Sequence, residues 1–201
     1  LIEEIGIEPR HILAITFTNK AANEMKERVI DILGDYASGA LLCTIHSLCV
    51  RILRQNIRVL EYPTNFIIMD EEDQKALLKK IFQDKQIDPK SISVKSCIHF
   101  ISSCKMARVT PARAMKLAGD FIGEQKKAAA YEAYEQYKEE HYMLDFDDLL
   151  LKTLEIFENY PEILEKWQRQ FQYIHVDEFQ DVGEVDYQLI KYLSEKSILC
   201  V

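Results

Sequence analysis

Two adjacent carboxylates, Asp177 and Glu178, follow the short apolar run Tyr173–Val176. This run predicts a buried strand, and the carboxyl ends of the strands in an open α/β sheet are where ligands bind. Unpaired charge is costly at that edge, so the two acids need a cation nearby. In phosphoryl-transfer enzymes an Asp can hold Mg²⁺ at such a position, and a neighbouring Glu can activate the attacking water.

The same acids have a second interpretation. Asp177 or Asp181 can instead cap the following helix by accepting hydrogen bonds from its free backbone amides. The acid pair alone does not separate a metal site from a helix cap.

A strand, a polar turn and a helix are predicted near the start of the chain. Ile12–Phe17 is apolar on both faces, rich in β-branched residues and too short for a helix, so it indicates a buried and parallel strand. Thr18 or Asn19 can cap the helix that follows and ends at Gly34. The apolar face of that helix consists of Ala22, Met25 and Val29.

The pattern repeats at Leu41–Ile45, with His46 and Ser47 at the turn and a further helix beyond them. Two successive units of this kind predict a doubly wound α/β domain with a parallel sheet.

The middle of the chain has the residue pattern of helices alone. From Asp70 to His141 the pattern indicates helices, with Asp70 and Asp73 placed as an N-cap and its N3 partner. Thr110-Pro111 is a helix start by cap and N1 preference. Three tyrosines, at 131, 134 and 137, stripe a long polar helix and are expected to face a core or an interface. We therefore predict an inserted α-helical subdomain over residues 66–142, between α/β parts at 1–65 and 143–201.

Composition limits the partners. Lys+Arg 25 against Asp+Glu 33 gives a net charge of −8, which disfavours a protein that wraps nucleic acid by bulk electrostatics. Any DNA contact must then be local. Two sets of cations are candidate basic surfaces, although such spacing also fits a solvated helix face: Arg51, Arg54 and Arg58, and Lys105, Arg108, Arg113 and Lys116.

Targeting and thiol signals point to the cytoplasm. No apolar run is long enough to cross a bilayer, and Leu1 is followed by acids rather than by a basic signal-peptide start. The five cysteines include no Cys-x-x-Cys pair, so we expect reduced thiols. A zinc site built from Cys97, His99 and Cys104 is a weaker alternative, because the spacing suits no common site.

Four segments resemble motifs of superfamily 1 helicases of the UvrD/PcrA/Rep family, in the family's order. Ile174–Asp181 resembles motif II in its Asp-Glu-aromatic-Gln-Asp form, and Ile12–Ala22, continuing to Met25 and Arg28, resembles motif Ia. Thr44–Leu53 resembles motif Ib, and Asp145–Leu149 resembles the short acidic motif ahead of motif II. The helical middle resembles the family's inserted subdomain in placement and texture.

The resemblance implies part of a RecA-like P-loop NTPase domain, 1A, interrupted by subdomain 1B. It implies an enzyme that uses ATP and Mg²⁺ to move on single-stranded DNA, typically 3′ to 5′, and to unwind duplex. Carried over residue by residue, Asp177 coordinates Mg²⁺ with Glu178 beside it, Glu178 is also the catalytic base, and Gln180 senses the nucleotide state. The implied DNA contacts are Phe17, Thr18, Asn19, His46 and Ser47; from the residues alone, Phe17 also suits a core position and His46 a structural histidine.

Two departures from the family pattern stand out. Val182, Gly183 and Asp186 replace the usual Thr, Asn and Gln after motif II. No Gly-x-x-x-x-Gly-Lys-Ser/Thr phosphate loop (Walker A) occurs, so no nucleotide phosphate cradle is assigned here. In the family this loop would precede Leu1 and a second RecA-like domain would follow Val201.

The missing loop leads us to expect a helicase fragment that is inactive alone. Two alternatives remain: a non-catalytic module that kept the fold to bind DNA or a protein, and the helicase subunit of an AddA/RecB-type helicase-nuclease. Intact Asp177 and Glu178 count against the module, because a protein without hydrolysis does not need two costly neighbouring carboxylates.

Overall fold

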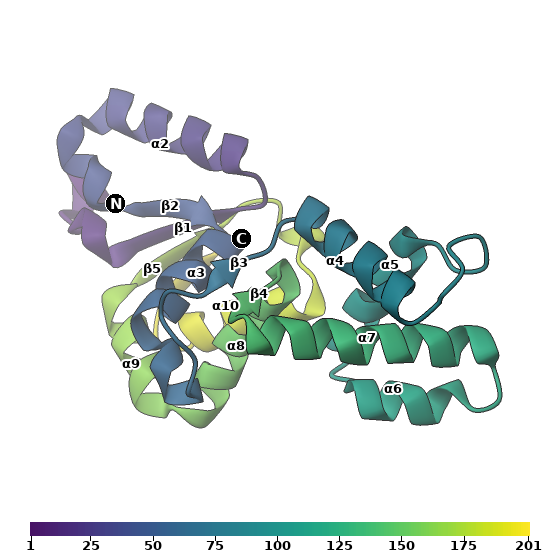
Figure 1. The fold of residues 1–201 in the computed structure, drawn as a ribbon. Helices are drawn as coiled ribbons and strands as arrows, with labels where there is room; N and C mark the ends of the chain where they lie inside the picture. The colour runs from purple at the N-terminus through teal and green to yellow at the C-terminus, as the bar shows by residue number, and fades with distance from the viewer. The chain divides into compact units, whose positions relative to one another are not determined.

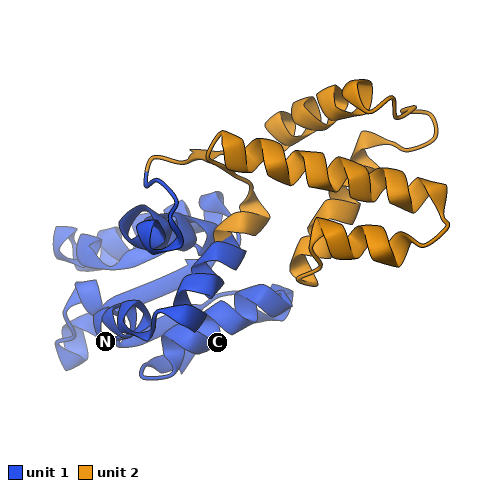
Figure 2. Cartoon of the chain, turned by 60° about the horizontal axis from the view of Figure 1, so that its bottom comes forward, with its two compact units in different colours: residues 1–64, 150–201 blue, residues 65–149 orange.

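A computed structural model describes residues 1–201, which form two compact units (Figure 2). The α/β unit comprises residues 1–64 and 150–201, and the helical unit comprises residues 65–149. The helical unit is thus an insertion between two parts of the α/β unit. Its extent is close to the range 66–142 expected from the sequence but reaches further at the C-terminal end, since the first turn of the next helix packs within it.

A parallel sheet organises the α/β unit (Figure 1). Its four strands lie in the order β2 (Leu41–Thr44), β1 (Ile12–Thr16), β5 (Tyr173–Val176) and β6 (Ile198–Cys200). Each neighbouring pair is parallel. The predicted α/β fold class, with a parallel sheet and an inserted helical part, is confirmed.

Helices connect these strands. The α/β unit contains α1 (Ile2–Ile5), α2 (Asn19–Leu33), α3 (Ile45–Asn56), α9 (Pro161–Gln170) and α10 (Glu184–Ser194). Helix α8 (Phe146–Asn159) begins in the helical unit and ends in the α/β unit. Short 3-10 turns η1 (Pro9–His11), η2 (Asp35–Gly39), η3 (Ile57–Leu60) and η4 (Phe179–Asp181) complete this part.

Burial of β1 forms the centre of the α/β core. All five of its residues are buried, as expected of an inner parallel strand covered on both faces. Leu13 is fully enclosed, and the largest buried side chain of this unit, Trp167, stacks on Phe171 with ring centroids 5.9 Å apart. Apolar burial on this scale is the main source of the unit's stability.

The helical unit has a separate apolar core. Helices α4 (Glu71–Asp84), α5 (Val94–Met106), α6 (Pro111–Ala118) and α7 (Ile122–Glu140) pack around it. Asp70 and Asp73 form the predicted capping box at the start of α4, and Thr110 caps α6. Tyr131 and Tyr134 are buried in the core, whereas Tyr137 is partly buried against it.

Three strands of the structure are not predicted from the sequence. β3 (Ile67–Ile68) and β4 (Met143–Leu144) pair in parallel within the helical unit. Two residues are too few to show an alternating pattern. β6 was missed because its short apolar run lies at the end of the chain and is exposed along its length. No helix is long and apolar enough to span a membrane.

Replacing Leu13 by Ala tests the position of the core. We expect the free energy of unfolding to fall by about 2–5 kcal/mol, because truncation leaves a cavity in a strand covered on both faces. Ile32→Ala is the matched control, since Ile32 is 74% exposed, and we expect a change below about 0.5 kcal/mol. Urea denaturation followed by circular dichroism measures both. Equal effects would contradict the burial of β1.

Candidate functional site

Three strand ends meet at one edge of the sheet, here called the carboxyl edge. Thr16 of β1 is in register with Thr44 of β2, and Ile15 is in register with Val176 of β5. The next residue, Asp177, donates its backbone N–H to the carbonyl oxygen of Ile15 at 2.9 Å. The acids after β5 therefore begin beside the turn that follows β1.

The turn after β1 is held by its threonines. The buried Thr16 hydroxyl donates to the carbonyl oxygen of Thr18 at 3.0 Å, and the Thr18 hydroxyl accepts from the Ala21 amide at 3.1 Å. Thr18 is thus the N-cap of α2, as predicted. Thr18 and Asn19 are exposed and Phe17 is half-buried. This turn presents the positive end of a helix to the surface.

The turn after β2 is similar. Thr44 is buried and caps α3, accepting from the Ser47 amide at 3.2 Å, while the two hydroxyls lie 2.9 Å apart. Ser47 is exposed and His46 is half-buried. The candidate residues of both turns therefore lie at helix N-termini on neighbouring strands, where backbone amides favour anions such as phosphate.

The acids after β5 occupy a tight turn. Asp177 and Glu178 are exposed, and one carboxylate oxygen of Asp177 accepts the Glu178 amide at 3.1 Å. Glu178 has φ 52°, in the left-handed region that residues with a side chain rarely adopt. Its carboxylate accepts a hydrogen bond from the Gln180 side-chain amide. The backbone turn, rather than a core contact, orients the catalytic candidates.

The helix-cap interpretation of these acids is wrong. Helix α10 begins after Gly183, whose backbone amide donates to the Asp186 carboxylate at 3.3 Å. Asp177 and Asp181 lie before that cap, so neither closes the helix. The exposed carboxylate oxygens of Asp177 and Glu178 are the hard ligands that Mg²⁺ prefers, and they therefore fit the metal interpretation.

Comparison with known proteins now decides the family. A family model described as "UvrD/REP helicase N-terminal domain" matches residues 1–201. The chain belongs to this family. The resemblance drawn from the four motifs is therefore confirmed over the whole chain.

Several helicases are close relatives of this UvrD/REP family member. It is 44% identical over 202 aligned residues to the ATP-dependent DNA helicase PcrA of Staphylococcus aureus (strain NCTC 8325 / PS 47) and of Bacillus subtilis (strain 168). The matches cover 100% of this chain but only 28% and 27% of those relatives. The chain thus spans little more than a quarter of their length.

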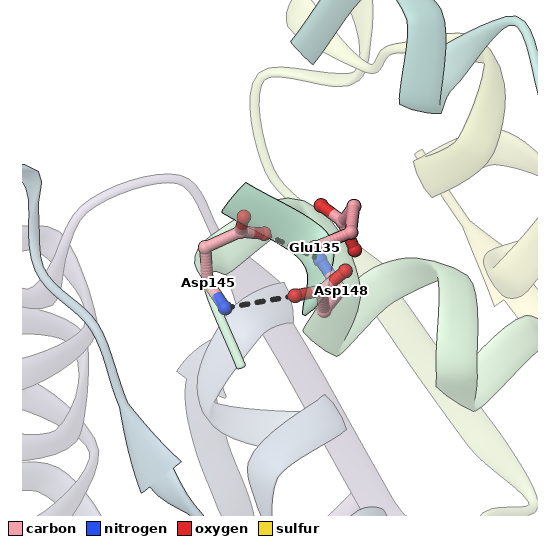
Figure 3. Close-up of side chains that lie close together, drawn as sticks. All are labelled: Glu135, Asp145 and Asp148. Carbon is pink, nitrogen blue, oxygen red and sulfur yellow. Dashed lines mark hydrogen bonds between the residues drawn. The ribbon is translucent and has the colours of Figure 1, made fainter. Parts of the chain in front are cut away.

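A second cluster of titratable groups lies in the helical unit of this UvrD/REP chain (Figure 3). At the start of α8, the backbone amide of Asp145 donates to the Asp148 carboxylate and the amide of Asp148 donates to the Asp145 carboxylate, each at 3.0 Å. The Nζ atom of Lys105, on α5, lies 2.6 Å from Oδ1 of Asp145, and the Nζ atom of Lys138, on α7, lies 3.0 Å from Oδ2. Glu135 completes what we call the Lys–Asp cluster, 2.9 Å from Lys138.

At Asp145 and Lys138 of the Lys–Asp cluster, attraction between opposite charges outweighs the cost of burial. Burial alone raises the pKa of Asp145, but Lys138 and Lys105 together hold that pKa well below its ordinary value. Burial disfavours the Lys138 ammonium, yet Asp148, Asp145 and Glu135 raise its pKa well above the usual one. Tyr134 adds a hydrogen bond to Asp145 at 3.0 Å. The cluster therefore favours the charged forms of Asp145 and Lys138, and it joins three helices.

The three carboxylates of the Lys–Asp cluster lie close enough to share a metal ion. Two ammonium groups already supply the cations, however, with Lys105 and Lys138 both within hydrogen-bond distance of Asp145. We therefore assign the cluster a structural role. A lysine placed seven residues after Tyr131 on the apolar face of α7 was the signal in the sequence that we overlooked.

Two expectations are corrected in the helical unit. Lys105 is 5% exposed, so it belongs to the buried cluster and not to a basic surface with Arg108, Arg113 and Lys116. The zinc alternative also fails, because Cys97 is fully buried while His99 is exposed on α5. By contrast, Arg51, Arg54 and Arg58 are exposed.

Replacing Lys138 by Met tests the Lys–Asp cluster. We expect the free energy of unfolding to fall by about 3–5 kcal/mol, because the substitution leaves buried carboxylates short of a cation. The control is Lys79→Met on the same unit, where the lysine is exposed, and we expect stability to stay unchanged. Thermal and urea unfolding measure both. A Lys138 variant as stable as the control would show that the cluster is not buried in solution.

Proposed function

We propose that this chain is part of a motor that uses ATP to move along DNA and to separate its strands. The observation that carries the proposal is the hydrogen bond from Asp177 to Ile15, which brings the acids to the same edge as the turns at Thr18 and Ser47. Family membership supports it, and the relatives are named ATP-dependent DNA helicases. In this proposal the α/β unit is part of motor domain 1A and the helical unit is subdomain 1B.

The acids serve the nucleotide side. Asp177, with Glu178 beside it, would hold Mg²⁺, and Glu178 would accept a proton from the attacking water. Bound Mg²⁺ supplies charge neutralisation for the phosphates. Gln180 already contacts the Glu178 carboxylate, so it is placed to respond when that carboxylate changes partner. The phosphate cradle is not built by residues 1–201, which contain no Walker A pattern.

The two turns serve the DNA side. Thr18, Asn19 and Ser47 lie at helix N-termini, where backbone amides and hydroxyls bind phosphate oxygens without reading bases. His46 adds an imidazole ring that can donate a hydrogen bond to a phosphate oxygen. Phe17 is half-buried, which leaves part of its ring available to stack on a base of any identity. Such contacts do not depend on base identity, so they suit a protein that moves along DNA of any sequence. They are also local, which fits a protein whose net charge is −8.

A phosphate-release assay tests the nucleotide side. With MgATP and oligo(dT), we expect residues 1–201 to release phosphate no faster than their Asp177→Ala variant, because the acids have no cradle to present the γ-phosphate to them. The variant controls for contaminating ATPases. If the unmodified chain hydrolysed ATP ten times faster than the variant, the expectation that the acids need a separate phosphate cradle would be wrong.

Fluorescence anisotropy with labelled oligo(dT) tests the DNA side. We expect Asn19→Glu to weaken binding about fivefold, the effect of roughly 1 kcal/mol of repulsion between a carboxylate and a phosphate about 4 Å apart in water. Ile32→Glu adds the same charge at the far end of α2 and should change binding less than Asn19→Glu. If both variants bind alike, the turn after β1 is not a DNA contact.

A further inference from the structure

The turn that carries the acids combines a strained backbone with exposed side chains. Glu178 has φ 52°, and a residue with a side chain keeps this left-handed conformation only where its surroundings enforce it. Four residues of the turn are exposed, namely Asp177, Glu178, Gln180 and Asp181, whereas Phe179 is half-buried. Phe179 is therefore the residue whose side chain can connect this turn to the body of the α/β unit.

The ring of Phe179 contacts Tyr187 of α10. The two ring centroids lie 6.3 Å apart and the ring planes meet at 68°, an edge-to-face arrangement that aromatic pairs favour. Helix α10 is anchored in the core by Val185 and Leu189, which are both buried. Tyr187 therefore offers its ring from a fixed element, and a side chain on such an element can hold a neighbouring turn precisely.

Main-chain hydrogen bonds inside the turn do not attach it to α10. The Asp181 amide donates to the carbonyl oxygen of Glu178 at 2.9 Å, and the Val182 amide donates to that of Phe179 at 3.2 Å. Both bonds join residues of the turn to each other, so they close the turn without fixing its position against the helix. The contact between the Phe179 and Tyr187 rings joins the closed turn to α10.

We propose that Tyr187 is a positioning residue for the acids: its ring holds Phe179 and thereby keeps Glu178 in the left-handed turn that exposes both carboxylates at the carboxyl edge. The functional meaning rests on the proposed Mg²⁺ role of Asp177 and Glu178. The stabilisation by one edge-to-face pair and the strain of one left-handed residue are of similar size, so the pair can offset much of that strain. The tyrosine hydroxyl is not needed for this role, and phenylalanine at position 187 should perform it equally well.

Amide hydrogen exchange, measured by NMR on residues 1–201 without DNA or nucleotide, tests the contact. The Asp181 amide is bonded inside the turn, so its exchange reports how often the turn opens. We expect Tyr187→Leu to speed this exchange about fivefold, the effect of losing one edge-to-face pair. Tyr187→Phe keeps the ring and should keep the original rate. Tyr192→Leu makes the same change on another face of α10 and should also leave the rate unchanged.

Equal exchange of the Asp181 amide in Tyr187→Leu and Tyr187→Phe would overturn the proposal. Faster exchange in Tyr192→Leu to the same extent as in Tyr187→Leu would also overturn it, because the effect would then be a general loosening of α10.

The NOE between the amide proton and Hα of Glu178 separates positioning from a general loss of stability. This NOE is strongest when φ is positive, because the two protons are then closest together. We expect it to weaken in Tyr187→Leu and to stay strong in Tyr187→Phe. Phe179→Leu removes the other ring of the pair and should weaken the NOE in the same way, which covers the case in which Tyr187→Leu does not fold. An unchanged NOE in both leucine variants would overturn the positioning role.

Titration with Mn²⁺, a paramagnetic substitute for Mg²⁺, tests the functional meaning. We expect Mn²⁺ to broaden the Glu178 amide signal of the unmodified chain, and we expect Tyr187→Leu to need about fivefold more Mn²⁺ for the same broadening. Equal requirements in Tyr187→Leu and Tyr187→Phe would overturn the positioning of the acids for metal. If the unmodified chain shows no broadening while the exchange and NOE results are as expected, the Mg²⁺ proposal is wrong and the positioning of the turn by Tyr187 stands.

Discussion

Parallel pairing of β1 with β5 brings together two segments that the whole helical unit separates in sequence. Its last backbone contact, from Asp177 to Ile15, sets where the acids start relative to the turn capped by Thr18. A shift of one residue in this register would turn every side chain of β5 to the opposite face. The geometry of the carboxyl edge therefore depends on main-chain hydrogen bonds, and the side chains of Asp177 and Glu178 remain exposed.

The helical unit is held together partly by buried ion pairs. Its apolar core is conventional, but α5, α7 and the start of α8 are joined by buried opposite charges. Ionic contacts of this kind add little net stability compared with apolar packing, but they penalise every arrangement that leaves one member unpaired. The segment Asp145–Leu149 thus begins helix α8 and also pairs with buried lysines of α5 and α7. Because these lysines neutralise its carboxylates, the acidic motif can be buried.

Much of the fold was readable from the residues. The apolar run at Ile12–Thr16, the threonine caps and the capping box at Asp70 are local patterns, and they predicted strands and helix starts correctly. The acids and both polar turns follow strands of one sheet, and the register places them at its carboxyl edge. Local patterns do not contain tertiary information, such as the burial of Lys105 and the pairing of two-residue strands. Each of these depends on partners distant in sequence.

The left-handed backbone of Glu178 has a consequence for how the chain can vary. Glycine adopts this conformation without strain, so selection for thermodynamic robustness alone would drive position 178 toward glycine. In the proposed site, the carboxylate at this position carries a backbone strain that glycine would avoid. Variants enriched purely for heat resistance should therefore drift toward glycine at position 178.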